Sequence, residues 1–359
     1  MFGTRKYYAA PPGAETGSGG IAVVLVNLGT PAAPTTAAVR RYLDQFLSDP
    51  RVIEQPRWLW WLILNGVILR LRPARSARAY ASIWTKTGSP LLVNSQALAQ
   101  ALGGSLKRSA GDGVDVHLAM TYGEPALSAV LRSLVGAGRR RVLVLPLYPQ
   151  YSATSTGAVF DALADAIKTL RWPPELRTIG DYHDQPAHIE ALARSVERHW
   201  AAHGRAERLL LSFHGIPRRY VEAGDPYAMQ CSATAARLAA RLGVGDDGVV
   251  VSFQSRVGRE EWLRPYTDQK LEEFAKAGVS SVQVLCPAFA VDCLETLEEI
   301  AVENRERFLH AGGQRYEYIA ALNDGEDQVA ALSELVLRHI QGWLPAENPA
   351  AAGVPNVGA

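Results

Sequence analysis

The stretch LLLSFHGIP, from Leu209 to Pro217, carries an apolar run into a turn that glycine and proline break. A second stretch, VVLVNLGTP from Val23 to Pro31, repeats the order of apolar strand, two residues, glycine, one residue and proline. Such apolar runs are typical of strands in parallel sheets that helices cover on both faces. The likeness is compatible with an ancient duplication, and also with the general similarity of strand-to-loop junctions. In both stretches the unusual residues follow a strand, where open α/β sheets bind ligands.

Short β-branched runs alternate with amphipathic segments along the whole chain. This alternation predicts an α/β protein with two Rossmann-like, doubly wound domains, each with a parallel sheet flanked by helices. The expected strands are 21–27, 115–120, 141–147 and 175–179 in the first half, and 208–213, 248–253, 281–286 and 316–320 in the second.

The expected domain organisation follows from these strands and from the composition of the ends, which are rich in alanine, glycine and proline. Flexible tails are expected at both ends, two Rossmann-like domains between them, and a C-terminal helix that packs back on the first domain. The expected ranges are 1–19 for the first tail, 20–182 for the first domain with an apolar lip at 58–72, 183–325 for the second domain, 326–344 for the helix and 345–359 for the last tail.

The bulk composition excludes several classes of protein. A formal net charge of +1 argues against a nucleic-acid partner, which would usually require a basic excess. Three cysteines without a CxxC pair predict reduced thiols in a cytoplasmic protein rather than disulfides or structural zinc. The N-terminus lacks the apolar core of a secretory signal, and no apolar run reaches the ~20 residues that span a bilayer. Neither a GxGxxG pattern nor a P-loop follows the first strand, so nucleotide binding is not predicted.

His214 is the first candidate for chemistry, because Gly215 and Pro217 break the strand directly after it. A neutral histidine at a strand end can take a proton or bind a divalent metal near neutral pH. A histidine bonded to a loop carbonyl would give the same pattern. The residue alone does not decide between the two.

A row of carboxylates forms the second candidate. Glu295, Glu299 and Glu303 are spaced i, i+4 and i+8, so a helix places them on one face. If the row points into a cleft, it could pass a cation or protons along. If it points outward, it would be an ordinary solvated acidic face.

Two further segments suit a large amphipathic ligand. The loop 148–157, which contains Tyr151 and Ser152, offers flat and hydroxyl-bearing side chains, although a capped helix start would look similar. The Trp-rich segment 58–69, followed by Arg70 and Arg72, would form an apolar lip edged by arginines. It would also suit shallow docking on an anionic membrane, and a core helix with a charged end is the alternative.

Several motifs together resemble the ferrochelatases, lyases that insert ferrous iron into a porphyrin at the end of haem synthesis. The resemblance runs from about residue 21 to residue 324. In chain order its markers are LVNLGTP, the TGSP turn, LPLYPQYS, LSFHGIP, FQSRVG with WLRPYTD, and CPAFAVDCLETLEEI.

The resemblance implies a chelatase-like fold with a porphyrin cleft between the domains, and Fe(II) and protoporphyrin IX as substrates. His214 and Glu295 match the catalytic and metal-binding positions of the family, and Glu299 and Glu303 match acidic positions that form a possible relay. The expected porphyrin contacts are Asn27, Leu28, Trp61, Arg70, Arg72, Ser89, Tyr122, Tyr151 and Ser152.

The chain departs from the family pattern at three positions. Ala153 replaces a cluster cysteine and no cysteine follows Cys293, so no 2Fe–2S cluster and no prosthetic group are expected. Thr121 replaces a common arginine or lysine, so a propionate contact is lost or comes from another arginine. Cys293 stands where some members have histidine, so the relay beyond Glu295 is expected to differ.

A monomer is favoured, with peripheral contact between the lip and the inner membrane face as an option.

Alternatives to this function remain open at the level of the sequence. The same chemistry on coproporphyrin is the nearest, and the long apolar lip favours the less carboxylated protoporphyrin. A cobalt or nickel chelatase is another, since the choice of iron comes from the resemblance. A non-catalytic porphyrin or haem carrier is the third, although a carrier would have no need of a proton acceptor.

Overall fold

The computed structural model describes residues 7–8, 20–245, 248–258 and 260–344. The two expected tails lie outside the described residues, apart from Tyr7 and Tyr8. Within the described part of the chain, the strands form two four-stranded sheets in which every neighbouring pair is parallel.

The first sheet has the order β2-β1-β3-β4 and the second the order β6-β5-β7-β8, so the two halves repeat one topology. The fold predicted from the sequence, two α/β halves with parallel sheets, is confirmed. The strands are β1 (Ile21–Asn27), β2 (Val114–Met120), β3 (Arg141–Pro146), β4 (Glu175–Thr178), β5 (Arg208–His214), β6 (Val249–Gln254), β7 (Ser281–Leu285) and β8 (Arg315–Ile319).

Helices cover both faces of the first sheet, which explains why all seven residues of β1 are buried. Leu98 and Leu102 of α4 pack on one face, and Leu131 of α5 and Val159 of α6 pack on the other. The helices of this half are α1 (Thr36–Leu47), α2 (Arg57–Ile63), α3 (Leu69–Ile83), α4 (Pro90–Ala110), α5 (Leu127–Gly136) and α6 (Ala158–Ile167), with π-helices η2 (Leu64–Ile68) and η3 (Ala153–Gly157).

The second sheet is covered in the same way. Its strand β5 buries Leu211 and Phe213 against α7 and α9, and Leu210 against α10. The helices of this half are α7 (Pro186–His203), α8 (Arg218–Glu222), α9 (Tyr227–Leu242), α10 (Thr267–Lys276), α11 (Arg305–His310) and α12 (Glu326–His339), with the π-helix η4 (Glu295–Asn304).

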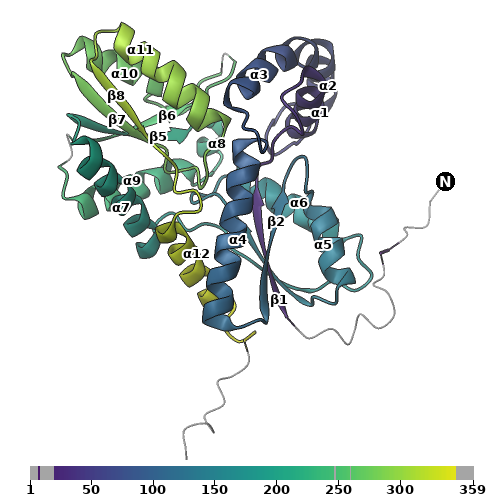
Figure 1. Ribbon diagram of the computed structural model, residues 1–359. Helices are drawn as coiled ribbons and strands as arrows, with labels where there is room; N and C mark the ends of the chain where they lie inside the picture. Colours follow the sequence, from purple (N-terminus) through teal and green to yellow (C-terminus); the bar gives the residue numbers. More distant parts are fainter. Residues whose placement is uncertain (1–6, 9–19, 246–247, 259, 345–359) are drawn as a thin grey trace, which may run out of the picture.

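Helix α12 packs against α4 of the first half and α7 of the second, and so lies between the two sheets (Figure 1). The Ser333 hydroxyl donates to Ser105 of α4 at 2.9 Å, and Asp327 forms an ion pair with Arg194 of α7 at 3.1 Å. The boundaries expected at residues 182 and 325 stay predictions.

The helices bear on whether the chain could cross a membrane. Among the helices of the described residues, none combines the length and the apolar character that crossing a bilayer requires.

His188 of α7 is a buried titratable residue away from the strand ends. It is 5% exposed, and its ring stacks edge-on against Tyr182 with 5.1 Å between centroids. Its Nε2 has no hydrogen-bond partner within the described part of the chain. Burial, assisted by nearby His183, lowers the pKa of His188 to about 4.

We predict that this histidine makes the fold sensitive to acid. The unfolded chain binds the His188 proton below its ordinary pKa near 6.5, whereas the folded chain binds it only near pH 4. Stability should therefore fall as the pH drops through this window, by roughly 3 kcal/mol for this residue alone. Chemical denaturation between pH 7 and pH 4 should show a shallower loss for His188→Phe. The same slope in wild type and His188→Phe, with exposed His310→Phe as control, would contradict the prediction.

Candidate active site

His214 is the last residue of β5 and is half-buried at the carboxyl edge of the second sheet. The ring nitrogen Nδ1 lies 2.7 Å from the carbonyl oxygen of Gly215. A carbonyl can only accept, so Nδ1 carries the hydrogen and Nε2 of the neutral ring keeps a lone pair. The bond to a loop carbonyl, which was the alternative to a chemical role, is thus present. It still leaves Nε2 able to accept a proton or bind a metal.

The turn after His214 is held tightly against the neighbouring strand β6. The N–H of Gly215 donates to the carbonyl oxygen of Gln254 at 2.8 Å. A Cβ atom at residue 215 would lie 2.8 Å from that same oxygen and 3.2 Å from the ring of Trp262, so the turn requires glycine here. The histidine therefore stands on a rigid strand rather than on a free loop.

The acidic row lies on η4, which follows β7 after a short connection. The sequence predicted an ordinary helix, whereas residues 295–304 form a π-helix with i→i+5 hydrogen bonds. Its wider turn still keeps residues four apart near one another. Glu295 and Glu299 are half-buried and Glu303 is exposed, so the row leads from the interior to the surface.

Glu299 is clamped by Ser255, the residue after β6. The Ser255 N–H donates to one carboxylate oxygen at 2.8 Å, and its hydroxyl donates to the other. Ser255 has a φ of 65°, an unusual value for a residue with a side chain. Burial raises the pKa of Glu299 and Glu295 raises it further, while the Ser255 bonds and His214 lower it. His214, Glu295 and Glu299 thus share one electrostatic environment.

A pocket of about 230 Å³ opens at the outer end of the row. Its lining includes Ser255, Glu299 and Glu303, together with Asn304, whose Oδ1 is buried without a partner among the described residues. The lining combines these oxygen-bearing side chains, which suit a divalent cation, with two arginines, Arg256 and Arg307.

Three buried tyrosines of the first half are close enough to Glu295 to respond to its charge. Burial raises the pKa values of Tyr42, Tyr80 and Tyr148, and the charge of Glu295 raises each of them further. The Tyr148 hydroxyl has no partner of hydrogen-bond geometry among the described residues, although Thr121 is near enough to lower its pKa. These hydroxyls stay protonated and therefore uncharged, and that of Tyr42 donates to the Gly29 carbonyl oxygen at 3.1 Å.

Arg72 of α3 also faces Glu295. The residue as a whole is exposed, yet burial lowers its pKa and Glu295 opposes that shift. The two observations are compatible if the stem lies on the surface while the guanidinium turns inward among protein atoms. Arg75, one turn later, similarly lowers the pKa of Glu298, which burial raises. Helix α3 therefore presents basic side chains to η4.

The Trp-rich segment forms α2 and η2 and is a surface feature, so its interpretation as a core helix is wrong. Trp58 is 70% exposed and Trp61 is 63% exposed, and Arg70 at the start of α3 is exposed as well. We call residues 58–72 the lip. Its other exposed apolar side chains are Leu59, Leu62, Ile63, Val67 and Leu71.

Three of the expected porphyrin contacts lie at the end of β1, in the loop that follows it and at the start of α4. Asn27 and Ser89 are buried: the Asn27 amide donates to Ser95 at 3.1 Å, and the Ser89 hydroxyl accepts from Thr30 at 2.8 Å. Both side chains thus hold the loop to α4. Leu28 is half-buried and packs in the cluster that contains Tyr42.

Of the remaining three expected contacts, Tyr122 and Ser152 have their hydroxyls engaged within the protein, and Tyr151 has its backbone N–H engaged. The Tyr122 hydroxyl donates to Asp49 at 2.8 Å, and burial raises its pKa. Ser152 caps η3, as the alternative for this loop foresaw, and its hydroxyl donates to Asp225 of the second half at 2.9 Å. The Tyr151 N–H donates to Gln230 of α9 at 2.6 Å. This loop therefore joins the two halves.

The sequence did not single out Tyr42, Tyr80 or Ser255. Ser255 stands within the FQSRVG motif, so its presence there was the available signal. The tyrosines carried no signal of their own, because buried tyrosines on amphipathic helices are common core residues.

The described residues contain one group of three side chains with metal-ligand atoms within 4.8 Å of each other, namely Asp181, His183 and Asp184. Its members are already paired: His183 contacts Asp181 at 2.7 Å, and Asp184 forms an ion pair with Arg237 at 3.3 Å. His214 and Glu295 therefore do not complete a closed three-ligand site with a third described residue, which suits transient handling of a metal better than storage.

Proteins of known structure share this fold. The structure of SirB from Bacillus subtilis with Fe3+ has a TM-score of 0.53 at 13% identity, covering 90% of this chain and 97% of that chain. The structure of sirohydrochlorin chelatase SirB from Bacillus subtilis subspecies spizizenii with cobalt has a TM-score of 0.51 at 13% identity, covering 93% and 98%. The molecule thus has the fold of a chelatase.

Sequence comparison specifies the family. The ferrochelatase profile matches residues 20–340. The ferrochelatase of Idiomarina loihiensis is 54% identical over 338 residues, 94% of this chain and 93% of the relative. That of Teredinibacter turnerae is 56% identical over 321 residues, 89% and 88% of the two chains. The chain belongs to the ferrochelatase family, which confirms the resemblance drawn from its motifs.

We predict that Gly29, in the loop after β1, cannot be replaced without loss of stability. Its φ is +110°, and a Cβ atom there would lie 1.7 Å from the carbonyl oxygen of Tyr122. Gly29→Ala should lower the free energy of unfolding by about 2–4 kcal/mol, measured by chemical denaturation. Gly66→Ala is the matched control, since space is open around that helical residue. Equal stability of the two variants would contradict the prediction.

Proposed function

We propose that this protein inserts Fe(II) into protoporphyrin IX to give protohaem and two protons. The observation that carries the proposal is the geometry of His214: its Nδ1 is bonded to the Gly215 carbonyl oxygen, its Nε2 keeps the lone pair, and its charge acts on Glu299, as that of Glu295 does. Membership of the ferrochelatase family supports the reaction class.

In this proposal His214 is the proton acceptor. Its Nε2 takes one pyrrole N–H proton, releases it to solvent and then takes the second, while the freed nitrogen lone pairs turn to the incoming Fe(II), so two protons leave for each iron bound. The neighbouring carboxylate of Glu299 favours the imidazolium that forms. Porphyrin nitrogens become metal ligands only when the ring is bent, and contacts at the ring periphery can supply that distortion.

The carboxylate row is the proposed route of the iron. Glu303 at the surface, Glu299 in the clamp of Ser255 and Glu295 inside offer oxygen ligands in sequence. Carboxylates and a histidine bind Fe(II) without great selectivity, so the ion can move inward from site to site. We infer that Glu295 presents the ion to the porphyrin.

We propose that the lip binds the edge of the porphyrin. Trp61 and its apolar neighbours would cover the macrocycle, and Arg70 and Arg72 would pair with its propionates where Thr121 lacks a charge. The remaining expected contacts act indirectly, since Asn27, Ser89, Tyr122 and Ser152 have their polar groups bonded within the protein.

The size of the exposed apolar surface favours protoporphyrin, with two carboxylates, over the more carboxylated coproporphyrin. It also suits shallow contact with the headgroups of an anionic membrane, with arginines beside it, and we propose a cytoplasmic protein that meets the inner membrane face through the lip. The absence of a 2Fe–2S cluster stays a prediction from Ala153 and from the lack of cysteine after Cys293.

An anaerobic assay with Fe(II) and protoporphyrin tests the proposal directly. Wild type should form metalloporphyrin, and His214→Ala should fold normally but lose about 10²–10⁴-fold in rate, because the proton acceptor is gone. Absorbance of the product measures the rate, and circular dichroism measures the fold. Zinc, cobalt and nickel serve as comparison metals, and coproporphyrin as comparison substrate.

The outcomes of this assay separate the alternatives. Near-normal turnover by His214→Ala would remove the assigned role. Faster turnover of coproporphyrin would reassign the substrate, and turnover of cobalt or nickel without iron would reassign the metal. Porphyrin binding without turnover of any metal would make the chain a carrier.

A second prediction concerns Glu295→Gln, which keeps the shape of the side chain and removes its charge. If Glu295 presents the iron, kcat should fall by about 10²-fold or more while porphyrin affinity, measured by fluorescence quenching, changes little. His310→Gln, an exposed change on α11, is the matched control. A defect confined to porphyrin affinity would count against a chemical role.

A further inference from the structure

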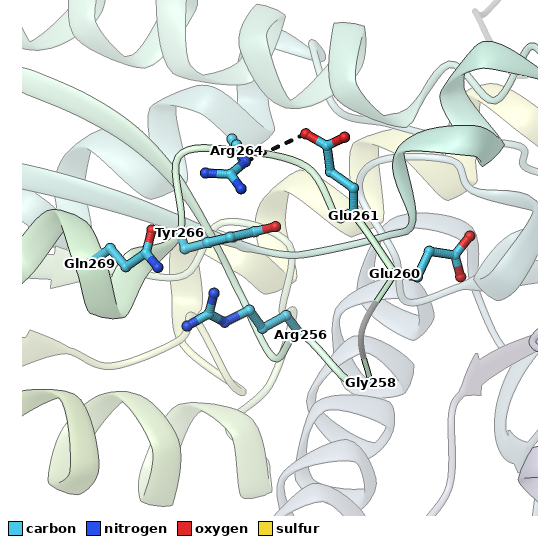
Figure 2. A pocket seen from close by; sticks show the side chains of 7 residues that line it. All are labelled: Arg256, Gly258, Glu260, Glu261, Arg264, Tyr266 and Gln269. Atoms are coloured by element: carbon cyan, nitrogen blue, oxygen red, sulfur yellow. Dashed lines mark ion pairs between the residues drawn. The ribbon is translucent and has the colours of Figure 1, made fainter.

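Arg219 of α8 joins three separate parts of the molecule. It forms an ion pair with Glu54 of the first half at 2.9 Å and also donates to the Glu54 carbonyl oxygen at 3.4 Å. A second ion pair joins it to Glu260, in the loop between β6 and α10. In Figure 2 the Glu260 side chain extends away from Tyr266 and the other residues of the pocket drawn there. Each ion pair is partly exposed, so its strength depends on both carboxylates being held in place.

Tyr220, the next residue, makes a second connection between the halves. Its hydroxyl donates to the carbonyl oxygen of Val52 at 3.1 Å and accepts from the N–H of Glu54 at 3.4 Å. The Arg219 guanidinium lies over the Tyr220 ring, 4.4 Å from its centroid. The buried ring thus supports the arginine while its hydroxyl grips the backbone of residues 52–54.

The two ends of this connection lie next to the lip and next to His214 in the chain. Residues 52–54 lead directly into α2, the first helix of the lip. Arg219 and Tyr220 follow His214 by five and six residues, across the rigid turn at Gly215. The backbone of this segment is fixed further by two bonds, from Arg218 N–H to Glu261 and from Leu263 N–H to Ile216.

We infer that Arg219 and Tyr220 form a latch that sets the position of the lip relative to His214. They are positioning residues: neither is assigned a contact with substrate, and both act by holding residues 52–54 against the second half. The inference rests on the proposed function for its kinetic consequences. Its structural core, that the latch restrains the lip, does not depend on the substrate.

The latch has a defined kinetic consequence. With the latch intact, the lip stays close to the site, which slows exchange of the porphyrin and favours the bent ring. Releasing it should speed porphyrin dissociation and slow the insertion step itself, because less of the peripheral binding energy is available for distortion.

A double-mutant cycle on Glu54→Gln and Arg219→Gln tests the latch. Each single variant should speed porphyrin dissociation, followed by stopped-flow fluorescence without metal, by about two- to fivefold, the range of a partly exposed ion pair. The double variant should dissociate no faster than Arg219→Gln, because both changes break one contact. Additive effects of the two changes would overturn the inference.

Two further variants distinguish the latch from a general loss of structure. Tyr220→Phe keeps the ring under Arg219 but removes the hydroxyl, so it should also speed dissociation. Arg218→Gln is the matched control, since Arg218 pairs with Glu222 and Glu261 and makes neither of the contacts to residues 52–54 described above. An equal effect of Arg218→Gln would overturn the inference.

Hydrogen exchange of residues 57–68 without any ligand provides a readout independent of the reaction. Arg219→Gln should exchange faster there than wild type, while the amides of β1 and β5 stay protected. Unchanged exchange in the lip would overturn the latch. If wild type failed to insert iron but the lip exchanged faster in the variant, the proposed function would fail and the latch would stand.

Discussion

The parallel pairing of β5 with β6 and β7 is the constraint on which the site depends. Parallel neighbours end at the same edge of a sheet, so His214, the Ser255 that follows β6, and the η4 segment that follows β7 are brought to one place. Close packing on both faces fixes this register, because a shift of one residue would exchange the side chains that fit against α7 and α9 with those that fit against α10. The chemistry therefore rests on the packing of the core and needs no loop to find its own position.

The nature of the site follows from what surrounds Glu295. Its charge acts on buried tyrosines of the first half, whose pKa values burial raises, and on Glu299, which lines a pocket that opens to solvent. In the proposed function, buried tyrosines on one side and a row of carboxylates leading to solvent on the other would give the cation one direction of approach. The tyrosines belong to the first half and the carboxylate row to the second. The site therefore exists only when the two halves are packed together.

Much of this was predictable from sequence, and the limits have physical causes. The eight strands and the position of His214 followed from apolar runs and from glycine and proline, which act locally. The π-helix could not be foreseen, since an i, i+4 spacing of Glu295 and Glu299 fits both kinds of helix. The engagement of Ser152 with Asp225 depends on residues 73 positions apart. The sequence of the lip fitted both a surface segment and a core helix, because the exposure of its side chains depends on tertiary packing.

Helix α12 has a consequence for the order of assembly. It follows both sheets in the chain and packs on α4 and α7 at once. During synthesis each sheet can form its own core while α12 is still being made, as domains commonly do. The joint between the halves becomes complete only when α12 arrives, with Asp327 and Ser333 meeting opposite sides. A chain that ended before α12 would keep the contacts that the 148–157 loop and Arg219 make between the halves, but it would lack the helix that packs on α4 and α7 at once.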